Sequence, residues 1–131
     1  MAMKPALFLA LAAGLLFAGL TAASAAEASR GKLVHVVAFK FKDTAAPADI
    51  RRVEEAFAAL PAKIPQIASF EWGTNVSPEK LDKGFTHGFI LTFRTEKDRD
   101  DYLVHPDHKK FGAVVGPVLA DVFVVDFWAK P

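Results

Sequence analysis

The chain has 131 residues, with 16 basic and 15 acidic side chains, 12 phenylalanines and no cysteine. A formal net charge of +1 provides no field to attract nucleic acid, and the lack of cysteine excludes disulfides and lipid attachment through a thiol. We therefore expect one domain without a nucleic-acid partner, held together by the burial of aromatic and aliphatic side chains.

The first 25 residues are typical of an export signal. One basic residue, Lys4, is followed by an uncharged apolar run over 6–20 and then by small residues up to Ala26. The run is shorter than the ~20 apolar residues of a membrane-spanning helix. Small side chains predict cleavage after Ala25 or after Ala26, and an uncleaved N-terminal anchor is the alternative. Cleavage leaves as many basic as acidic residues, in a periplasmic or secreted protein without a membrane partner.

The mature chain is predicted to begin with a flexible arm over 26–32, and a single domain follows over 33–129. Runs of β-branched and aromatic residues predict strands at 33–42, 68–72, 86–94 and 122–128. Apolar residues at helical spacing predict helices at 47–60, 96–103 and 106–120. The order β-α-β-β-α-β, with the second helical segment split in two, predicts an α+β fold of the ferredoxin-like type with a four-stranded antiparallel sheet.

The predicted helix ends depend on a few capping and breaking residues. Asp43 or Thr44 is expected to cap the first helix, and Thr95 the second. Proline at 61 is expected to help end the first helix, and a bend is possible at Gly116-Pro117.

The strands carry apolar side chains on both faces, whereas the helices of such a fold cover only one. The second face is predicted to hold Val34, Val36, Phe70, Trp72, Ile90, Phe123, Val125 and Phe127. A patch of this size exceeds what monomers usually expose. We therefore expect a homodimer that forms through the sheet face, with a barrel-like core between the subunits.

Polar residues interrupt the apolar strand faces at three places: His35, His87 and Asp126. All three can point toward the helices, where an unpaired polar group costs a few kcal/mol. We expect them to pair with one another or with nearby hydroxyls. A hydrogen-bonded core network without chemical activity is the alternative to a catalytic role.

Tyr102 and His108 flank the break between the last two helices. His108 falls in the first turn after Pro106, where the positive end of the helix dipole disfavours imidazolium. A neutral His108 with Asp126 on its other nitrogen is a candidate general base, and Tyr102 a candidate donor to an oxyanion. His105 and His108 have a spacing that a metal could use, but we expect His105 to act as a helix cap and we expect no metal or cofactor.

Five segments resemble, in order and spacing, the stress-responsive dimeric α/β-barrel (Dabb) domain. They are His35–Lys42, Phe70–Gly73, Gly84–Phe89, Tyr102–His108 and Val125–Phe127. The resemblance runs from about Lys32 to Trp128 and implies a ferredoxin-like monomer that pairs through its sheet.

One plant branch of this family, of the olivetolic acid cyclase type, closes a linear polyketide by aldol condensation in a pocket between sheet and helices. The resemblance carries its catalytic pair onto Tyr102 and His108, its supporting histidines onto His35 and His87, and its acid onto Asp126. Its cavity-lining residues differ from Val53, Glu54 and Phe57 here. The resemblance therefore does not imply the same substrate.

The function expected from these features is binding of a small apolar or carbonyl ligand by an exported homodimer. The expected pocket between sheet and helices is lined by His35, Val37, Phe57, His87, Phe89, Phe111 and Val124. The alternative is a small cyclase- or lyase-type enzyme that uses Tyr102, His108 and Asp126 on a carbonyl substrate.

Overall fold

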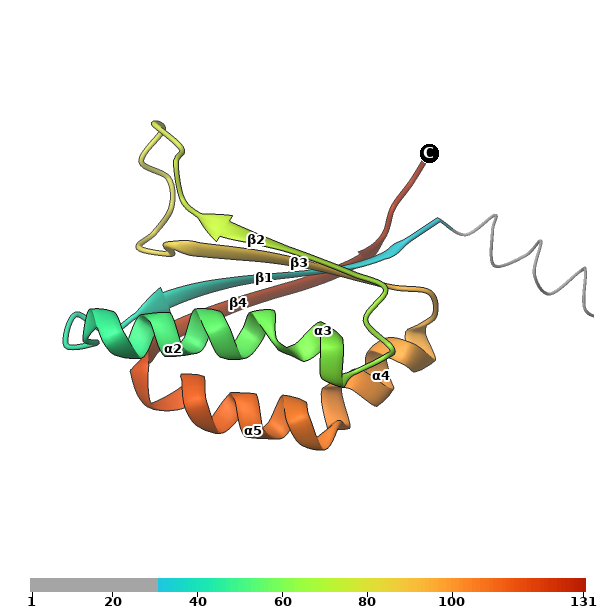
Figure 1. Cartoon of the computed structure of the whole chain (residues 1–131). Helices are drawn as coiled ribbons and strands as arrows, with labels where there is room; N and C mark the ends of the chain where they lie inside the picture. The colour runs from blue at the N-terminus through green and yellow to red at the C-terminus, as the bar shows by residue number, and fades with distance from the viewer. Residues whose placement is uncertain (1–30) are drawn as a thin grey trace, which may run out of the picture.

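The computed structural model describes residues 31–131, so the expected signal and most of the expected arm lie outside the described residues. In chain order the elements are β1 (Leu33–Phe41), α2 (Pro47–Ala58), α3 (Leu60–Lys63), β2 (Ser69–Thr74), β3 (His87–Phe93), α4 (Glu96–Val104), α5 (Pro106–Val115), a 3₁₀ turn (Gly116–Val118) and β4 (Leu119–Trp128) (Figure 1). All neighbouring strands are antiparallel, in the order β2-β3-β1-β4. The ferredoxin-like α+β fold is confirmed. Within 31–131, no helix combines the length and apolar character needed to cross a membrane.

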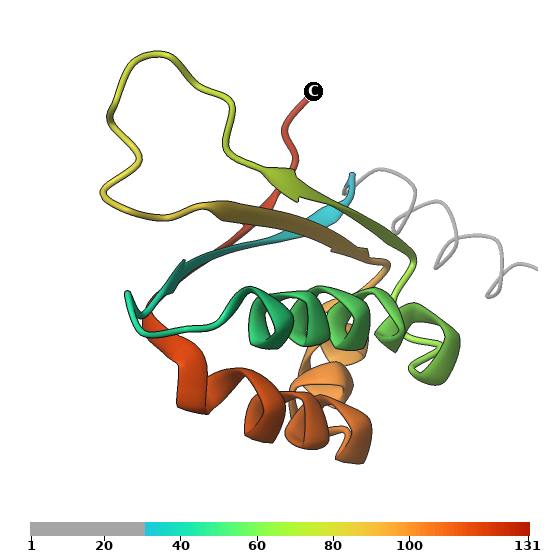
Figure 2. The ribbon, with the colours of Figure 1, turned by 60° about the vertical axis from the view of Figure 1, so that its left-hand side comes forward.

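The helices all lie against one face of the sheet, and the core fills the space between the two layers (Figure 2). Strand β1 alternates between buried and half-buried residues along its length, as expected for a strand with one covered face. Phenylalanine rings dominate the centre: the Phe57 ring lies 4.4 Å from that of Phe89 and 4.5 Å from that of Phe111. Helix α2 is thus held to the sheet and to α5 through Phe57.

The helix starts are partly as predicted. Thr95 caps α4, because its hydroxyl accepts a hydrogen bond from the backbone N–H of Asp98 at 3.0 Å. The expected cap of the first helix by Asp43 or Thr44 is wrong. Ala46 is the N-cap residue and makes no side-chain hydrogen bond. Pro47 follows it in the first turn, where the missing proline N–H would have had no partner within the helix.

The last helix and the last strand meet earlier than predicted. Helix α5 ends at Val115, the 3₁₀ turn includes Pro117, and β4 begins at Leu119 opposite Phe41. Proline has no backbone N–H to continue the helical ladder, so the chain turns at this point instead of running on to 120. The backbone N–H of Lys42 then donates to the Val118 carbonyl at 2.9 Å and fixes the start of β4 beside β1.

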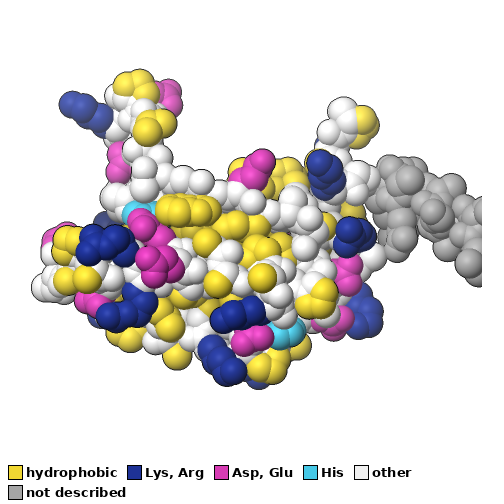
Figure 3. All heavy atoms as spheres, viewed as in Figure 1, with side chains coloured by type: hydrophobic (Ala, Val, Ile, Leu, Met, Phe, Trp, Pro, Cys, Tyr) yellow, Lys and Arg dark blue, Asp and Glu magenta, His cyan; other side chains and the backbone are white. Residues whose placement is uncertain are grey.

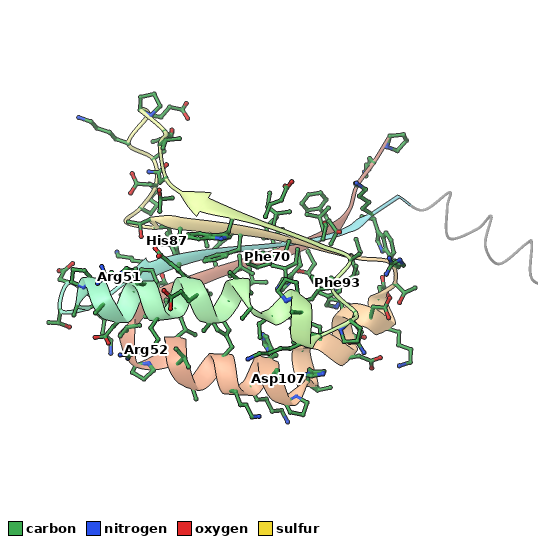
Figure 4. The ribbon with its side chains drawn as sticks, viewed as in Figure 1. Arg51, Arg52, Phe70, His87, Phe93 and Asp107 are labelled. Atoms are coloured by element: carbon green, nitrogen blue, oxygen red, sulfur yellow. The ribbon has the colours of Figure 1, made fainter. Side chains whose placement is uncertain are left out.

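The expected placement of Phe70 and Trp72 on the uncovered face is wrong. Phe70 pairs with Leu91 and Trp72 with Phe89, so both share the helix-facing side of β3. The Phe70 ring packs 5.2 Å from Phe57 (Figure 4). Hydrophobic side chains accordingly gather between the sheet and α2 on this side of the molecule (Figure 3). The other six residues of the expected patch face away from the helices, and we call this side of the sheet the open face.

The central phenylalanine cluster gives a direct test of the fold. Phe57→Ala is expected to lower the free energy of unfolding by about 3–5 kcal/mol, because it opens a cavity among the rings that join α2, α5 and the sheet. Urea denaturation measures this. Leu81→Ala, at a position 67% exposed in the β2–β3 loop, is the control and is expected to change stability by less than about 0.5 kcal/mol. Equal effects of the two substitutions would contradict this packing.

Candidate functional site

The buried His35 and the partly buried Asp126 form a pair at one end of the sheet. They lie directly opposite each other on β1 and β4, so their side chains share the helix-facing side. The His35 Nδ1 atom lies 2.6 Å from one carboxylate oxygen of Asp126, and Arg99 of α4 donates to the other oxygen at 2.7 Å. The predicted pairing of a strand histidine with Asp126 is confirmed, and Arg99 completes it.

The pKa of Asp126 lies below its ordinary value. Partial burial works to raise the pKa, but hydrogen bonds from Arg99 and His35 to the carboxylate outweigh it. Asp126 is therefore ionised at neutral pH and can only accept, so His35 donates from Nδ1. The group holds one carboxylate and one guanidinium together at the junction of β1, β4 and α4.

Tyr102 lies between His35 and His108. Its ring is 5.8 Å from that of His35 and 4.4 Å from that of His108, and it also packs 5.1 Å from Phe93 at this end of the sheet (Figure 4). The side chain is only 1% exposed. Burial, with the negative charge of Asp126 adding to it, raises the pKa of Tyr102 far above its ordinary value. The phenol is thus a permanent hydrogen-bond donor.

His108 is oriented by the backbone at the helix break. Helix α4 ends at Val104, and His105 caps α5 by accepting from the backbone N–H of Asp107 at 3.1 Å, as predicted. In the first turn of α5, His108 Nδ1 lies 3.1 Å from the Leu103 carbonyl oxygen. A carbonyl only accepts, so Nδ1 carries the proton of this hydrogen bond.

The pKa of His108 is below its ordinary value, mainly because burial disfavours the charged ring. The hydrogen bond to Leu103 opposes this, and nearby His35 and His105 add to it. His108 is therefore neutral at pH 7, with a free lone pair on Nε2. The expected hydrogen bond between His108 and Asp126 is wrong. Asp126 is occupied by His35 and Arg99, and the Leu103 carbonyl takes the orienting role instead.

His87 belongs to a second polar cluster at the other end of the core. Its Nε2 donates to a carboxylate oxygen of Glu54 at 2.8 Å, and its Nδ1 lies 2.8 Å from the Thr86 hydroxyl. The Trp72 ring stacks nearly parallel to the imidazole, at 6.2 Å. In the sheet His87 lies opposite Phe39, four residues along β1 from His35. The two histidines thus bind separate partners.

The apolar residues expected to line a pocket are divided in the same way. Val37, Phe57, Phe89 and Phe111 belong to the packed core between the two polar clusters. Val124 lies opposite Val37 on the edge strand β4, with its side chain on the helix-facing side, but it is half exposed and outside the packed core.

Arg99 was not among the predicted site residues, and Glu54 was named only at a cavity-lining position of the cyclase and not as the partner of His87. Arg99 precedes Tyr102 by three residues and so lies on the same side of α4, a spacing that could have identified it. Glu54 precedes the core residue Phe57 by the same spacing on α2. Within the described part of the chain, no group of three or more metal-binding side chains is arranged to hold an ion.

Comparison with known proteins places this geometry in a family. Residues 33–129 match the family described as Stress responsive A/B Barrel Domain, abbreviated Dabb. The chain belongs to the Dabb family. A stress-response A/B barrel domain-containing protein of Arabidopsis thaliana, HS1, is 34% identical over 101 residues, which cover 77% of this chain and 93% of the relative.

Two further proteins are similar to this chain. The olivetolic acid cyclase of Cannabis sativa is 28% identical over 93 residues, covering 71% of this chain and 92% of the cyclase. A solved protein from Thermobifida fusca, described as dimeric, ferredoxin-like and of unknown function, is 27% identical with a TM-score of 0.66. That alignment covers 76% of this Dabb chain and 93% of the other.

The state of His108 can be measured directly. NMR titration of the ring is expected to give a midpoint below about 6.5, because burial disfavours the imidazolium form. His105, a half-buried ring on the same break, is the comparison signal in the same spectrum. A midpoint for His108 at or above the ordinary histidine value would contradict the assignment of a neutral base.

The role of Asp126 in stability depends on pH. The pKa of Asp126 is lower in the folded than in the unfolded chain. The carboxylate therefore adds its full contribution to the free energy of unfolding above the unfolded-state pKa of about 3.9, and this contribution is lost as the pH falls through the folded-state pKa. The stability difference between the parent and Asp126→Asn is therefore expected to be largest near neutral pH and to shrink below about pH 4. Chemical denaturation from pH 7 to pH 3 measures it, and a difference that grows in acid would contradict the ion pair.

Proposed function

We propose that this Dabb protein is an exported homodimer that binds a small, uncharged ligand bearing a carbonyl or hydroxyl group. The observation that carries the proposal is that a hydrogen-bond donor, the Tyr102 hydroxyl, lies next to a hydrogen-bond acceptor, Nε2 of His108. The Tyr102 hydroxyl has no hydrogen-bonding partner among the described residues, and the Nε2 atom of His108 likewise has none within 31–131.

A carbonyl oxygen would accept from the Tyr102 hydroxyl, and a neighbouring hydroxyl or acidic C–H would lie toward His108 Nε2. The ligand would approach from the side of His108, since that ring is half-buried whereas Tyr102 is almost completely covered. The half-exposed Val124 on β4 would supply apolar contact beyond Asp126.

An uncharged ligand suits the electrostatics of this end of the core. The positive charge of Arg99 is matched by Asp126 and by Asp100, whose carboxylate lies 2.8 Å from the guanidinium. Both histidines nearest to Tyr102 are already oriented by a partner. A charged ligand would therefore find no free countercharge there, and desolvating it would cost several kcal/mol.

Homodimer formation and export complete the proposal. The open face carries half-exposed Phe123, Val125 and Phe127 on one strand, and a similar solved protein is described as dimeric. The first 25 residues have the basic, apolar and small-residue segments of an export signal. An exported protein would meet its ligand outside the cytoplasmic membrane.

The alternative is a cyclase- or lyase-type enzyme, favoured by the neutral His108 beside a protonated Tyr102. His108 Nε2 would remove a proton next to a carbonyl group, and Tyr102 would donate to the enolate oxygen that forms. The similarity to an olivetolic acid cyclase supports this possibility. Export argues against that substrate, because polyketide intermediates are made on carriers inside the cell.

Ligand binding is tested with protein purified from the periplasm. Native mass spectrometry is expected to find a small molecule bound to the parent and lost or reduced in Tyr102→Phe, which removes only the hydroxyl. The expected loss of affinity is about tenfold, the worth of one hydrogen bond in a desolvated site. Leu81→Ala is the control. Equal occupancy in the parent and Tyr102→Phe would contradict a site at Tyr102.

His108→Gln separates binding from catalysis. The glutamine side chain retains hydrogen-bonding capacity but cannot act as a base near pH 7, and Asp126 keeps both of its partners. The binding proposal expects that the ligand found on the parent is recovered unchanged after incubation with either protein. Conversion of that ligand by the parent but not by His108→Gln would establish the enzyme instead.

A further inference from the structure

The polar cluster around His87 uses both nitrogens of the imidazole ring. Nε2 lies 2.8 Å from a carboxylate oxygen of Glu54, and Nδ1 lies 2.8 Å from the Thr86 hydroxyl. A carboxylate only accepts, so Glu54 fixes the proton of the neutral ring on Nε2. Nδ1 then holds a lone pair, and the Thr86 hydroxyl donates to it. Hydroxyl, imidazole and carboxylate are thus joined in the order of the nucleophile, base and orienting acid of a serine hydrolase.

The imidazole of His87 is held in place by its neighbours. Its side chain is 7% exposed, and that of Glu54 is 23% exposed. The Trp72 ring stacks nearly parallel to the imidazole, and the Phe41 ring meets it edge-on at 5.0 Å. Because these rings exclude most of the water, the nearby carboxylate stabilises an imidazolium more strongly than it would at the surface. The ring can therefore take up a proton without losing its position.

Thr86 is exposed, unlike His87, and its backbone is fixed on both sides. It directly precedes β3, at the end of the sheet nearest the β2–β3 loop, where His87 also lies (Figure 4). Its N–H donates to the Phe39 carbonyl of β1 at 3.0 Å, and its carbonyl accepts from the N–H of Asn75 at 2.8 Å. The side chain is therefore held beside the imidazole and remains accessible.

A cavity of about 310 Å³ is lined by both Thr86 and His87. The β2–β3 loop adds the polar side chains of Asn75 and Asp82, while the sheet adds small residues such as Gly88. The Asp82 carboxylate is held by the N–H of Gly84 at 2.9 Å, and its charge disfavours an anionic ligand. A cavity of this volume and composition suits a small, uncharged molecule with a polar end.

We propose that Thr86, His87 and Glu54 form a second site, which hydrolyses small, uncharged esters through an acyl-threonine intermediate. Thr86 and His87 are its catalytic residues, and Glu54 is a positioning residue that orients the ring. The site lies at the opposite end of the core from Tyr102 and does not depend on the ligand proposed there. A substrate reaches Thr86 from the side of the β2–β3 loop.

The reaction follows from the hydrogen bonds of the three side chains. The Thr86 Oγ atom attacks the ester carbonyl carbon while its proton passes to Nδ1 of His87. The bond to the alcohol oxygen then breaks, and His87 gives the proton to that oxygen, which leaves the acyl group on Thr86. Water next attacks the acyl carbon and gives a proton to Nδ1, and the bond to Oγ breaks as His87 returns a proton to Thr86. One carboxylic acid and one alcohol are released, and the site is regenerated.

Hydrolysis of p-nitrophenyl acetate by protein purified from the periplasm tests this site. Thr86→Val replaces the hydroxyl by a methyl group and is expected to lower the rate by about 100-fold or more, whereas Thr86→Ser keeps it within about tenfold. Glu54→Gln is expected to lower kcat at least about tenfold with little change in KM, because the amide can accept from Nε2 but does not stabilise the imidazolium. Thr44→Val, exposed between β1 and α2 and outside the cavity, is the control and is expected to leave the rate unchanged.

Mass spectrometry of the acid-quenched protein locates the acyl group. An acetyl group on Thr86 of the parent that is absent from Thr86→Val supports the proposal. A parent no faster than buffer, or a Thr86→Val variant as active as the parent, overturns it. A rate that is lost in His108→Gln but kept in Thr86→Val also overturns it, and assigns the hydrolysis to the Tyr102 end of the core. Circular dichroism checks that each variant is folded, and Glu54→Gln together with the position of the acetyl group decides if Thr86→Val does not fold.

Discussion

Helices cover one face of this four-stranded sheet, while the strands carry apolar side chains on both. On the covered face, Phe57 joins α2 to Phe89 of the sheet and Phe111 of α5. On the open face, aliphatic and aromatic residues remain accessible along β4. Apolar area of this extent drives association in water. The same alternation along β1 that builds the core therefore also creates the open face, which we propose a second copy covers.

The packed phenylalanines also decide where polar chemistry can occur. They separate the His87–Glu54 pair from the group around Tyr102, so the polar residues form two small sites at opposite ends of the core. At the Tyr102 end, the orienting contacts come from two elements: Asp126 from β4, and Arg99 together with the Leu103 carbonyl from α4. The fold thereby fixes a donor and an acceptor next to each other without leaving an unpaired charge.

The long, regularly alternating strands made much of this predictable from the sequence. The alternation of side chains along β1 and β4 was enough to predict that His35 and Asp126 lie on the helix-facing side of the sheet. The short strand β2 was assigned the wrong face, because its side is set by hydrogen-bonding register with β3 and not by its own six residues. The partner of His108 was also missed. It depends on how far the α4–α5 break lies from β4. It also depends on the long Arg99 side chain, which reaches Asp126 from α4.

A crystal structure of the mature chain tests the central claim, that a second copy buries the open face, most directly. The account predicts a dimer joined through the open faces, in which each copy covers Phe123 and Phe127 of the other. It also predicts that the helices lie on the outside and that the Tyr102–His108 pair stays on the helix side of each sheet. A structure in which Phe123 and Phe127 remain open to solvent would contradict it.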